Sequence, residues 1–226
     1  MKQIPLGVRL QDRTIFTSFL PGDNGLALAS LQRMATGFTD RVYLHGPAGS
    51  GKSHLLQALC AAVGGSAYFP LGQLLASGPE VLDGTEQLSA VALDDVHLVI
   101  GDEAWERRLF NFYNDCESRG TRLAMAAALP AVGLGIQLPD LRSRLSSMTH
   151  FALRVLDESQ QREALQLRAA QRGLELPDET VRYLQRRFAR DMSTMQALLD
   201  RLDAASLAEQ RRITVPFIRQ VTGDPT

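Results

Sequence analysis

The chain has 226 residues, of which 45% are hydrophobic, and its 24 Lys and Arg face 25 Asp and Glu for a formal net charge of −1. This length accommodates one large or two small domains with a real core. The balanced charge argues against a protein that coats DNA or an acidic membrane, because such contacts need a clustered excess of basic residues.

The chain shows no sign of disulfides, secretion or membrane insertion. Cys60 and Cys116 lie in unrelated segments without a CxxC or zinc-ligand spacing, so we expect two small core residues rather than a metal cluster. The first residues contain no signal-peptide stretch, and no segment reaches the roughly 20 apolar residues of a membrane span. We therefore expect a globular, cytoplasmic protein without a membrane partner.

Short apolar runs alternate with helical patterns from about Phe19 to Phe151, which predicts a parallel α/β sheet. The predicted strands are residues 42–45, 67–70, 91–93 and 123–128, and the predicted helices are 25–34, 54–63 and 103–118. The third of these helices repeats apolar residues every three or four positions, which predicts a buried face. These residues are Trp105, Leu109, Phe112, Tyr113 and Cys116.

Only helical patterns follow Phe151. They cover residues 158–171, 178–189 and 193–210, and a last short helix starts at Thr214. Pro177 and Asp178 form the start signal of the second helix, and Gly173 closes the first. The sequence therefore predicts an α/β domain followed by a small all-helical domain.

A phosphate-binding motif stands between the first predicted strand and the second predicted helix, where residues 46–53 fit G-x-x-x-x-G-K-[ST] without a mismatch. Glycines let backbone N–H groups curl around phosphate oxygens, and the helix N-terminus adds its positive dipole end. Lys52 would neutralise the β- and γ-phosphates, the Ser53 hydroxyl would ligate Mg²⁺, and His54 could approach the phosphates. We assign binding of ADP or ATP to Gly46, Pro47, Ala48, Gly49, Ser50, Gly51, Lys52, Ser53 and His54.

An acidic pair, Asp94 and Asp95, follows the predicted strand 91–93. The carboxyl ends of parallel strands border the ligand crevice of such a sheet. Asp94 would hold Mg²⁺ through water, and Asp95 would orient or polarise the attacking water. Together with the glycine-rich motif, this Walker B pattern predicts an NTP-binding P-loop protein.

Several segments resemble the AAA+ domain of the bacterial replication initiator DnaA and of its short regulatory paralogues, the Hda group. They are residues 19–24, 51–56, 79–84, 93–96, 138–145 and 210–217. The resemblance covers essentially the whole chain and is nearest to the Hda group, the regulatory inactivators of DnaA. It implies a flexible segment in residues 1–12, a AAA+ parallel sheet flanked by helices in 13–153, and a small all-helical lid in 154–226.

The same resemblance implies DnaA as a partner. The initiators add a C-terminal helix-turn-helix domain that reads origin sequences, whereas this chain stops at Thr226, just past the lid. Without that domain or a basic surplus, we expect it to meet DNA only indirectly, through partners. A homodimer is a further option, because AAA+ modules tend to associate.

Residues 3–8 are similar to the Gln-Leu-x-Leu-Pro-Leu motif with which the Hda group binds the polymerase sliding clamp, the β subunit, although this copy ends in Leu-Gly-Val. Such a peptide places apolar anchors, here Ile4, Leu6 and Val8, in a hydrophobic groove, while the amide of Gln3 makes directional hydrogen bonds. By itself, so short a run also fits an ordinary disordered chain start.

Arg144 has the arginine-finger position by resemblance, within Ser-Arg-Leu at residues 143–145. At a subunit interface its guanidinium would touch the γ-phosphate of ATP held by a neighbouring DnaA, a contact that can be worth roughly 10³–10⁵ in rate. Arg142 is the alternative finger, and either arginine could instead be a solvated helix charge.

Two nucleotide sensors expected from the family are altered. The strand 123–128 ends in three alanines, Ala126 to Ala128, which offer no side-chain hydrogen bond. Ser193 stands where the family usually has a lid arginine, and Arg190 could substitute for it. Because transition-state contacts are lost while the phosphate loop is kept, we expect ADP binding to survive and intrinsic hydrolysis to be poor.

These features predict a AAA+ regulator of replication initiation. It would bind the DNA-loaded clamp and stimulate ATP hydrolysis by DnaA, which inactivates DnaA and prevents re-initiation. Two alternatives remain: an autonomous AAA+ ATPase acting as a helicase or clamp loader, and an adaptor that binds DnaA and the clamp without stimulating hydrolysis.

Overall fold

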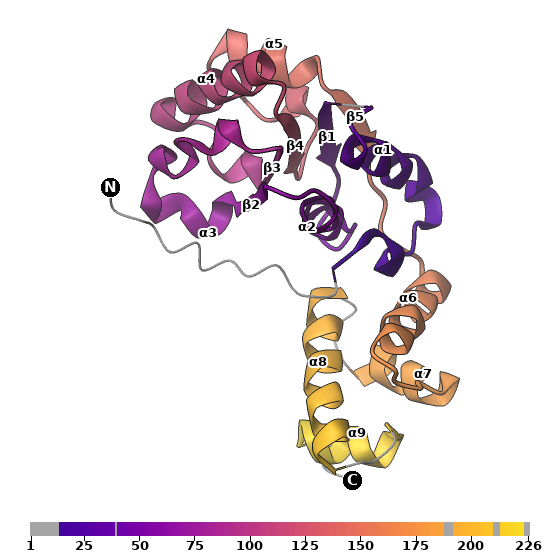
Figure 1. Cartoon of the computed structure of the whole chain (residues 1–226). Helices are drawn as coiled ribbons and strands as arrows, with labels where there is room; N and C mark the ends of the chain where they lie inside the picture. Colours follow the sequence, from indigo (N-terminus) through magenta and orange to yellow (C-terminus); the bar gives the residue numbers. More distant parts are fainter. Residues whose placement is uncertain (1–13, 39, 188–191, 210–212, 224–226) are drawn as a thin grey trace. The chain divides into compact units, whose positions relative to one another are not determined.

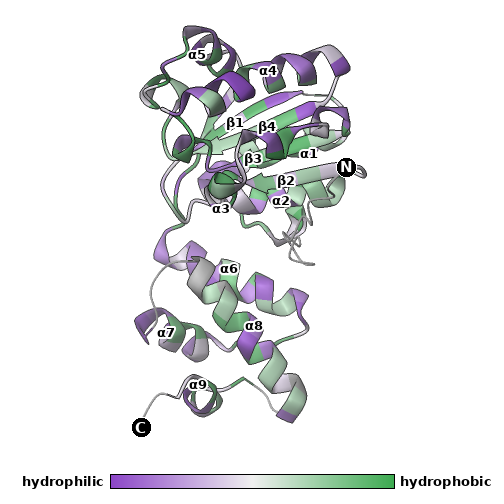
Figure 2. Cartoon of the chain, turned by 90° about the vertical axis from the view of Figure 1, so that its left-hand side faces the viewer, coloured by the Kyte–Doolittle hydropathy of each residue, from purple (hydrophilic) through white to green (hydrophobic). Residues whose placement is uncertain are grey.

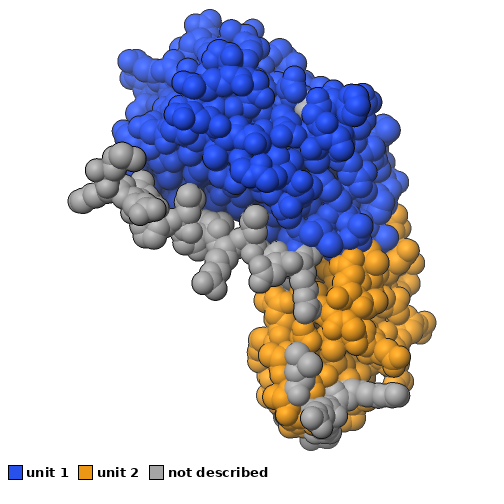
Figure 3. Space-filling view, in the orientation of Figure 1, with its two compact units in different colours: residues 1–155 blue, residues 156–226 orange. Residues whose placement is uncertain are grey.

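A computed structural model of the chain describes residues 14–38, 40–187, 192–209 and 213–223. The chain forms two compact units, residues 1–155 and 156–226 (Figure 3). The first unit contains the sheet, and the second contains helices alone (Figure 1).

The first unit is built on a five-stranded parallel sheet in the order β2-β3-β4-β1-β5. Its strands are β1 (Arg41–His45), β2 (Ser66–Pro70), β3 (Ala90–Asp94), β4 (Arg122–Ala127) and β5 (Thr149–Ala152). The four predicted strands are confirmed, and β5 is one that the sequence analysis missed. β5 is an edge strand with exposed and half-buried residues, so it lacks the continuous apolar run of a central parallel strand.

Helices cover both faces of this sheet (Figures 1 and 2). On one face α1 (Gly25–Ala35) and α2 (Lys52–Ala62) share a core with inward residues such as Val42, Leu44 and Ala92. On the other face α4 (Glu103–Arg119) and α5 (Pro139–Ser146) share a core with Tyr43 and Val91. Neighbouring strand residues thus enter opposite cores, because side chains alternate along a strand.

Short elements complete the first unit. They are the helix α3 (Leu71–Leu74) and the 3-10 turns η1 (Phe16–Ser18), η2 (Gly22–Asn24), η3 (Leu75–Ser77), η4 (Pro79–Leu82), η5 (Thr85–Gln87), η6 (Val96–Leu98) and η7 (Ala131–Gly133). Helix α2 starts two residues before the predicted start, inside the phosphate-binding motif itself. Helix α5 was not predicted from periodicity.

The predicted apolar stripe of α4 is confirmed as core. Trp105, Leu109, Phe112, Tyr113 and Cys116 are all buried in the cluster that α4 and α5 share. The helix begins at the N-cap Asp102, whose carboxylate accepts from the amides of Ala104 and Trp105, which satisfies two free amides of the first turn. It ends at Gly120 in the left-handed conformation.

The second unit consists of α6 (Glu158–Gln171), α7 (Asp178–Arg187), α8 (Met192–Glu209) and α9 (Val215–Thr222). Asp157 and Gln160 form a capping box at the start of α6, and Thr214 caps α9 through the amide of Phe217. One apolar cluster, which includes Leu199 and Phe217, forms its core. Within the described ranges, no helix combines the length and apolar character needed to cross a bilayer.

Candidate functional site

The glycine-rich loop joins the last residue of β1, His45, to the first residue of α2, Lys52. Its glycines at 46, 49 and 51 have φ angles of +152°, +77° and +93°, which side chains disfavour. A Cβ at Gly46 would lie 2.4 Å from the carbonyl oxygen of Leu153, and one at Gly51 would lie 2.6 Å from the ring of Phe19. The loop therefore requires glycine for both conformation and packing, and its bare backbone suits the close approach of a phosphate.

The side chain of Lys52 lies within this loop. Its ammonium donates to the carbonyl oxygens of Gly46, at 2.7 Å, and Pro47, at 2.9 Å. Burial lowers the pKa of Lys52, while the negative charges of Asp94 and Asp95 oppose that shift. The cation is thus placed where a phosphate would replace two weak carbonyl partners with a full negative charge.

Asp94 is the last residue of β3 and is only 1% exposed. One of its carboxylate oxygens accepts from the Tyr68 hydroxyl of β2 at 2.8 Å, and the other accepts from the amide of Asp95 at 2.9 Å. Burial raises the pKa of Tyr68, and the charge of Asp94 adds to this effect. Tyr68 therefore stays a hydrogen-bond donor that fixes the orientation of the carboxylate.

Asp95 has an unusual backbone conformation, with φ at +55°, and among the described residues no other non-glycine residue has a positive φ. This turn directs the chain from β3 into η6. Burial raises the pKa of the Asp95 carboxyl, and the charge of Asp94 contributes in the same direction. A left-handed backbone and a carboxylate whose charged form is disfavoured thus occur in the same residue, and such strain is often found at functional sites.

The end of β4 faces η6. The amide of Ala128 donates to Nδ1 of His97 at 3.3 Å, and Ala126 and Ala127 are buried. The strand thus ends in small apolar side chains, and the imidazole of His97 is a polar group next to that end.

The residues fit a nucleotide phosphate and a magnesium ion by their chemistry. A glycine-lined loop with an inward lysine fits the phosphate, and an exposed hydroxyl at Ser53 with the carboxylates of Asp94 and Asp95 fits the oxygen preference of Mg²⁺. The described part of the chain has no group of three or more His, Cys, Asp or Glu residues that could hold a metal. An ion at this edge would therefore depend on phosphate oxygens for much of its coordination, as Mg²⁺ commonly does.

His54, which the sequence analysis assigned to the nucleotide, has its imidazole against η1. Its Nε2 lies 3.1 Å from Oγ of Ser18 and 3.2 Å from the carbonyl oxygen of Ile15, and its ring lies 5.5 Å from that of Phe19. These contacts hold the segment before α1 against α2. A contact of His54 with phosphate stays a prediction.

Arg144 lies on α5 and packs against α4. Its guanidinium lies 5.5 Å from the ring centre of Tyr113 and 3.3 Å from a carboxylate oxygen of Glu117, and 40% of its side chain is exposed. Arg142, on the same helix, donates to the carbonyl of Ile136 in the loop before α5. The head group of Arg144 is thus placed at the surface on the α4 face of the sheet, opposite to the face that α2 covers.

Several predicted site residues lie outside the described residues. These are the clamp-binding residues Gln3, Ile4, Leu6 and Val8 and the substitute sensor Arg190; of Ser193, the side chain lies outside as well.

Sequence reasoning missed two residues of this region. Tyr68 lies inside the predicted strand 67–70, and a tyrosine with a polar hydroxyl in an otherwise apolar strand was the available signal. Glu106 lies on α4, three residues before Leu109 and seven before Tyr113, and therefore on the same buried face of the helix. A charged residue at a position of this apolar face was the available signal.

The fold of the chain, a five-stranded parallel sheet flanked by helices and followed by a helical unit, is similar to that of solved AAA+ structures of DnaA and RuvB. The chain is similar to domain III of the replication initiation protein DnaA of Thermotoga maritima, with 19% identity and a TM-score of 0.75 over 96% of this chain and 98% of that one. It is also similar to AMPPCP-bound DnaA of Aquifex aeolicus, with 20% identity and a TM-score of 0.69 over 85% and 66%. A variant of RuvB from Thermotoga maritima matches with 18% identity and a TM-score of 0.59 over 92% and 72%.

Two family models match parts of the chain. Residues 157–222 match the family described as Hda, lid domain, and residues 42–129, which contain the P-loop and the acidic pair, match the family described as RNA helicase. Residues 157–222 therefore match an Hda lid domain, and the chain as a whole has a fold similar to that of DnaA domain III.

Proposed function

We propose that this protein is a AAA+ regulator of replication initiation that stimulates ATP hydrolysis by DnaA. Its own nucleotide, ADP or ATP, would organise the module, and Arg144 would act on ATP held by a neighbouring DnaA. The result would be conversion of DnaA from its ATP form to its ADP form and suppression of repeated initiation.

The observation that carries this proposal is the position of Arg144 on a protein with an Hda-type lid. Its guanidinium is part-exposed and contacts α4 through Tyr113 and Glu117, whereas Lys52, Asp94 and Asp95 are gathered at the carboxyl edge of the sheet. An arginine on an exposed helix, away from the helix that follows its own P-loop, suits action in trans.

The chain's own nucleotide would be held by residues 46–53, and Mg²⁺ by Ser53 together with water bound to Asp94. The ion would neutralise phosphate charge when bound. Lys52 would exchange its contacts with the carbonyls of Gly46 and Pro47 for phosphate oxygens. Hydrolysis by the chain itself is expected to be weak, because β4 ends in alanines that cannot hydrogen-bond to a phosphate or a water through their side chains.

Attachment to DNA would be indirect. Gln3, Ile4, Leu6 and Val8 are proposed to bind the β sliding clamp as an extended peptide with apolar anchors. Clamp loaded on DNA would then concentrate the regulator where DnaA is to be inactivated, which raises the effective concentration of Arg144 near its target.

An autonomous AAA+ ATPase is the second candidate function. The complete P-loop and acidic pair favour it, as does the similarity of residues 42–129 to the RNA helicase family. The alanine end of β4 argues against it. It predicts turnover of ATP by the purified chain alone, without DnaA.

The deciding experiment measures ADP formation by ATP-loaded DnaA with the full chain, in the presence and absence of DNA-loaded clamp. We expect the wild-type chain to stimulate ADP formation only when DNA-loaded clamp is present. Arg144→Ala should abolish this stimulation. In Gln3→Ala, adding the clamp should no longer increase ADP formation. Arg142→Ala tests the alternative finger on the same helix: stimulation should persist in this variant if Arg144 is the finger.

Stimulation that survives in Arg144→Ala would overturn the trans-finger assignment. Binding of DnaA and clamp without any stimulation by the wild-type chain would favour the adaptor. Hydrolysis by the chain alone at a rate typical of active AAA+ enzymes would favour the second candidate.

A further inference from the structure

A buried carboxylate, Glu106, lies in α4 outside the nucleotide site. Glu106 is only 2% exposed. Both oxygens are used: one accepts from the amide of Gly101 at 2.9 Å, and the other accepts from the amides of Gln137 at 3.0 Å and Leu138 at 2.7 Å. A buried carboxylate is costly unless it is fully hydrogen-bonded, so this arrangement fixes the backbone segments that it joins.

Glu106 holds the start of α5. Leu138 is the N-cap of that helix and provides no side-chain cap, and the first helical residue, Pro139, has no N–H group to donate. The carboxylate of Glu106 on α4 therefore caps the start of α5 by accepting hydrogen bonds from backbone amides, a role that a neighbouring side chain usually has. Its negative charge also interacts favourably with the positive end of the helix dipole. Because α5 has only eight residues, the position of its start determines the position of the whole helix.

The same short helix carries Arg144, six residues after Leu138, or about 9 Å along the axis. Its buried residues Leu141 and Leu145 belong to the core that α4 shares, and the guanidinium lies against Tyr113 of α4. Helix α4 thus contacts α5 near both of its ends, through Glu106 at the start and through Tyr113 and Glu117 near the end. The two contacts define both the axial position and the rotation of α5.

We propose that Glu106 is a positioning residue for Arg144: the carboxylate anchors the start of α5 and so places the finger for the ATP of the neighbouring DnaA. This inference rests on the proposed function. A misplacement of about 1 Å in a catalytic group can cost on the order of a hundredfold in rate, so a residue that never touches the nucleotide can still control the maximal rate.

The test is Glu106→Gln, which keeps the size of the side chain but places an NH₂ group among backbone amides that also donate. We expect the maximal rate of DnaA hydrolysis at saturating regulator to fall at least tenfold. The regulator concentration that gives half-maximal stimulation should change less than threefold, and ADP binding by the variant should stay within twofold of wild type.

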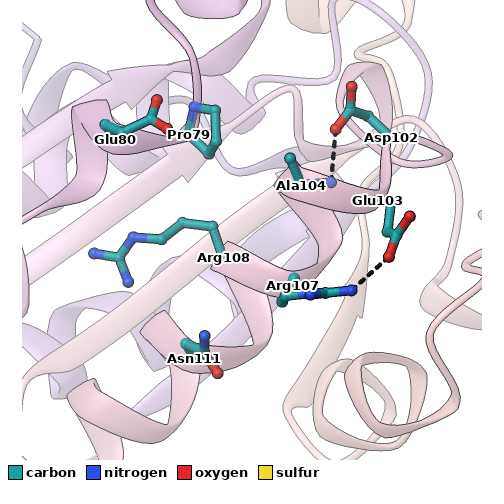
Figure 4. Close-up of a pocket in the computed structure, with 8 residues that line it drawn as sticks. All are labelled: Pro79, Glu80, Asp102, Glu103, Ala104, Arg107, Arg108 and Asn111. Carbon is teal, nitrogen blue, oxygen red and sulfur yellow. Dashed lines mark hydrogen bonds and ion pairs between the residues drawn. The ribbon is translucent and has the colours of Figure 1, made fainter.

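Glu103→Gln is the matched control. Glu103 lies on the same helix, one turn earlier, pairs with Arg107, and borders an open groove of about 580 Å³ (Figure 4). Its side chain is 82% exposed. It borders a cavity of about 190 Å³ together with Leu138 and Pro139, but no hydrogen bond or ion pair among the described residues joins its carboxylate to the start of α5. The control should leave both the maximal rate and the half-maximal concentration unchanged.

Two further measurements separate positioning from a general loss of structure. Glu106→Gln in an Arg144→Ala background should cause no additional loss of stimulation, because only Arg144 depends on the anchor. Hydrogen exchange of residues 137–146 should be faster in Glu106→Gln, while exchange in α2 and the lid should be unchanged. Should Glu106→Gln fail to fold, Glu106→Asp, which keeps the charge but shortens its reach, is expected to show the same pattern in weaker form.

The outcomes distinguish this inference from the function on which it rests. If Arg144→Ala abolishes stimulation but Glu106→Gln and Glu106→Asp keep the wild-type maximal rate, the positioning role is wrong and the function stands. Additional loss in the double variant, or unchanged exchange of residues 137–146, also overturns it. If wild type gives no stimulation that depends on Arg144, the proposed function fails instead.

Discussion

Replacing Gly46 by alanine tests how the phosphate loop is packed. The added Cβ would lie 2.4 Å from the carbonyl oxygen of Leu153, well inside any van der Waals contact. Leu153 cannot yield easily, because its amide donates to the carbonyl of His45 at 2.7 Å and its side chain is buried. The loop would therefore have to move away from the end of β5.

The expected cost has two parts. Holding alanine at a φ of +152° costs about 1–3 kcal/mol, and forcing a methyl group into packed backbone costs about 1–3 kcal/mol more. Gly49→Ala is the matched control, because Gly49 also has a positive φ but its Cβ would meet nothing within 4 Å. We expect Gly46→Ala to lower the free energy of unfolding of the first unit by about 1–3 kcal/mol more than Gly49→Ala does.

Denaturant unfolding of the full chain, followed by a probe in the first unit, measures this difference, and the melting temperature should differ by roughly 2–4 °C for each kcal/mol. ADP affinity should also fall more in Gly46→Ala, because the loop is displaced. Equal losses of stability in the two variants would refute the reasoning, since conformational strain would then account for the whole effect without any clash.

Three other changes test the acidic edge and its surroundings. Tyr68→Phe removes the hydroxyl donor to Asp94 and should lower the unfolding free energy by about 1–3 kcal/mol, with a weaker effect of Mg²⁺ on ADP affinity; unchanged stability would contradict the bond. Asp95→Asn should raise the free energy of unfolding at pH 7, because burial disfavours the charged carboxylate and asparagine tolerates a positive φ. Asp95→Ala should not raise it. Denaturant midpoints of the two variants measure this difference. Burial and then His150 lower the pKa of His45 below its usual 6.5, so the unfolded chain binds this proton more strongly. The contribution of neutral His45 to the free energy of unfolding is therefore complete above pH 6.5 and is lost as the pH falls below 6.5. His45→Gln should make the free energy of unfolding less dependent on pH between pH 8 and 5.

The local structure around both motifs was predictable because it depends on residues that are adjacent in sequence. The phosphate loop, the strand before it and the helix after it form one continuous segment, and the acidic pair directly follows a buried strand. Helix α6 coincides with residues 158–171 of the prediction because its capping box and apolar spacing are local signals. The match of residues 157–222 to the Hda lid is consistent with the resemblance read from the sequence.

The strand order and the edge strand β5 were not predictable from such signals. The chain order of the strands differs from their order in the sheet, since β1 lies between β4 and β5. Partial exposure of β5 removes the apolar run by which central parallel strands are recognised.

The sequence by itself therefore determined the fold class and the positions of the phosphate loop and the acidic pair, since each depends on patterns of residues close together in the chain. Only the tertiary structure joined Tyr68 to Asp94, 26 residues apart, and Glu106 to Leu138 at the start of α5, 32 residues away. It also placed Arg144 against Tyr113. These contacts arise when strands and helices pack side by side, and no periodicity within one element encodes which distant polar group will complete a buried hydrogen bond.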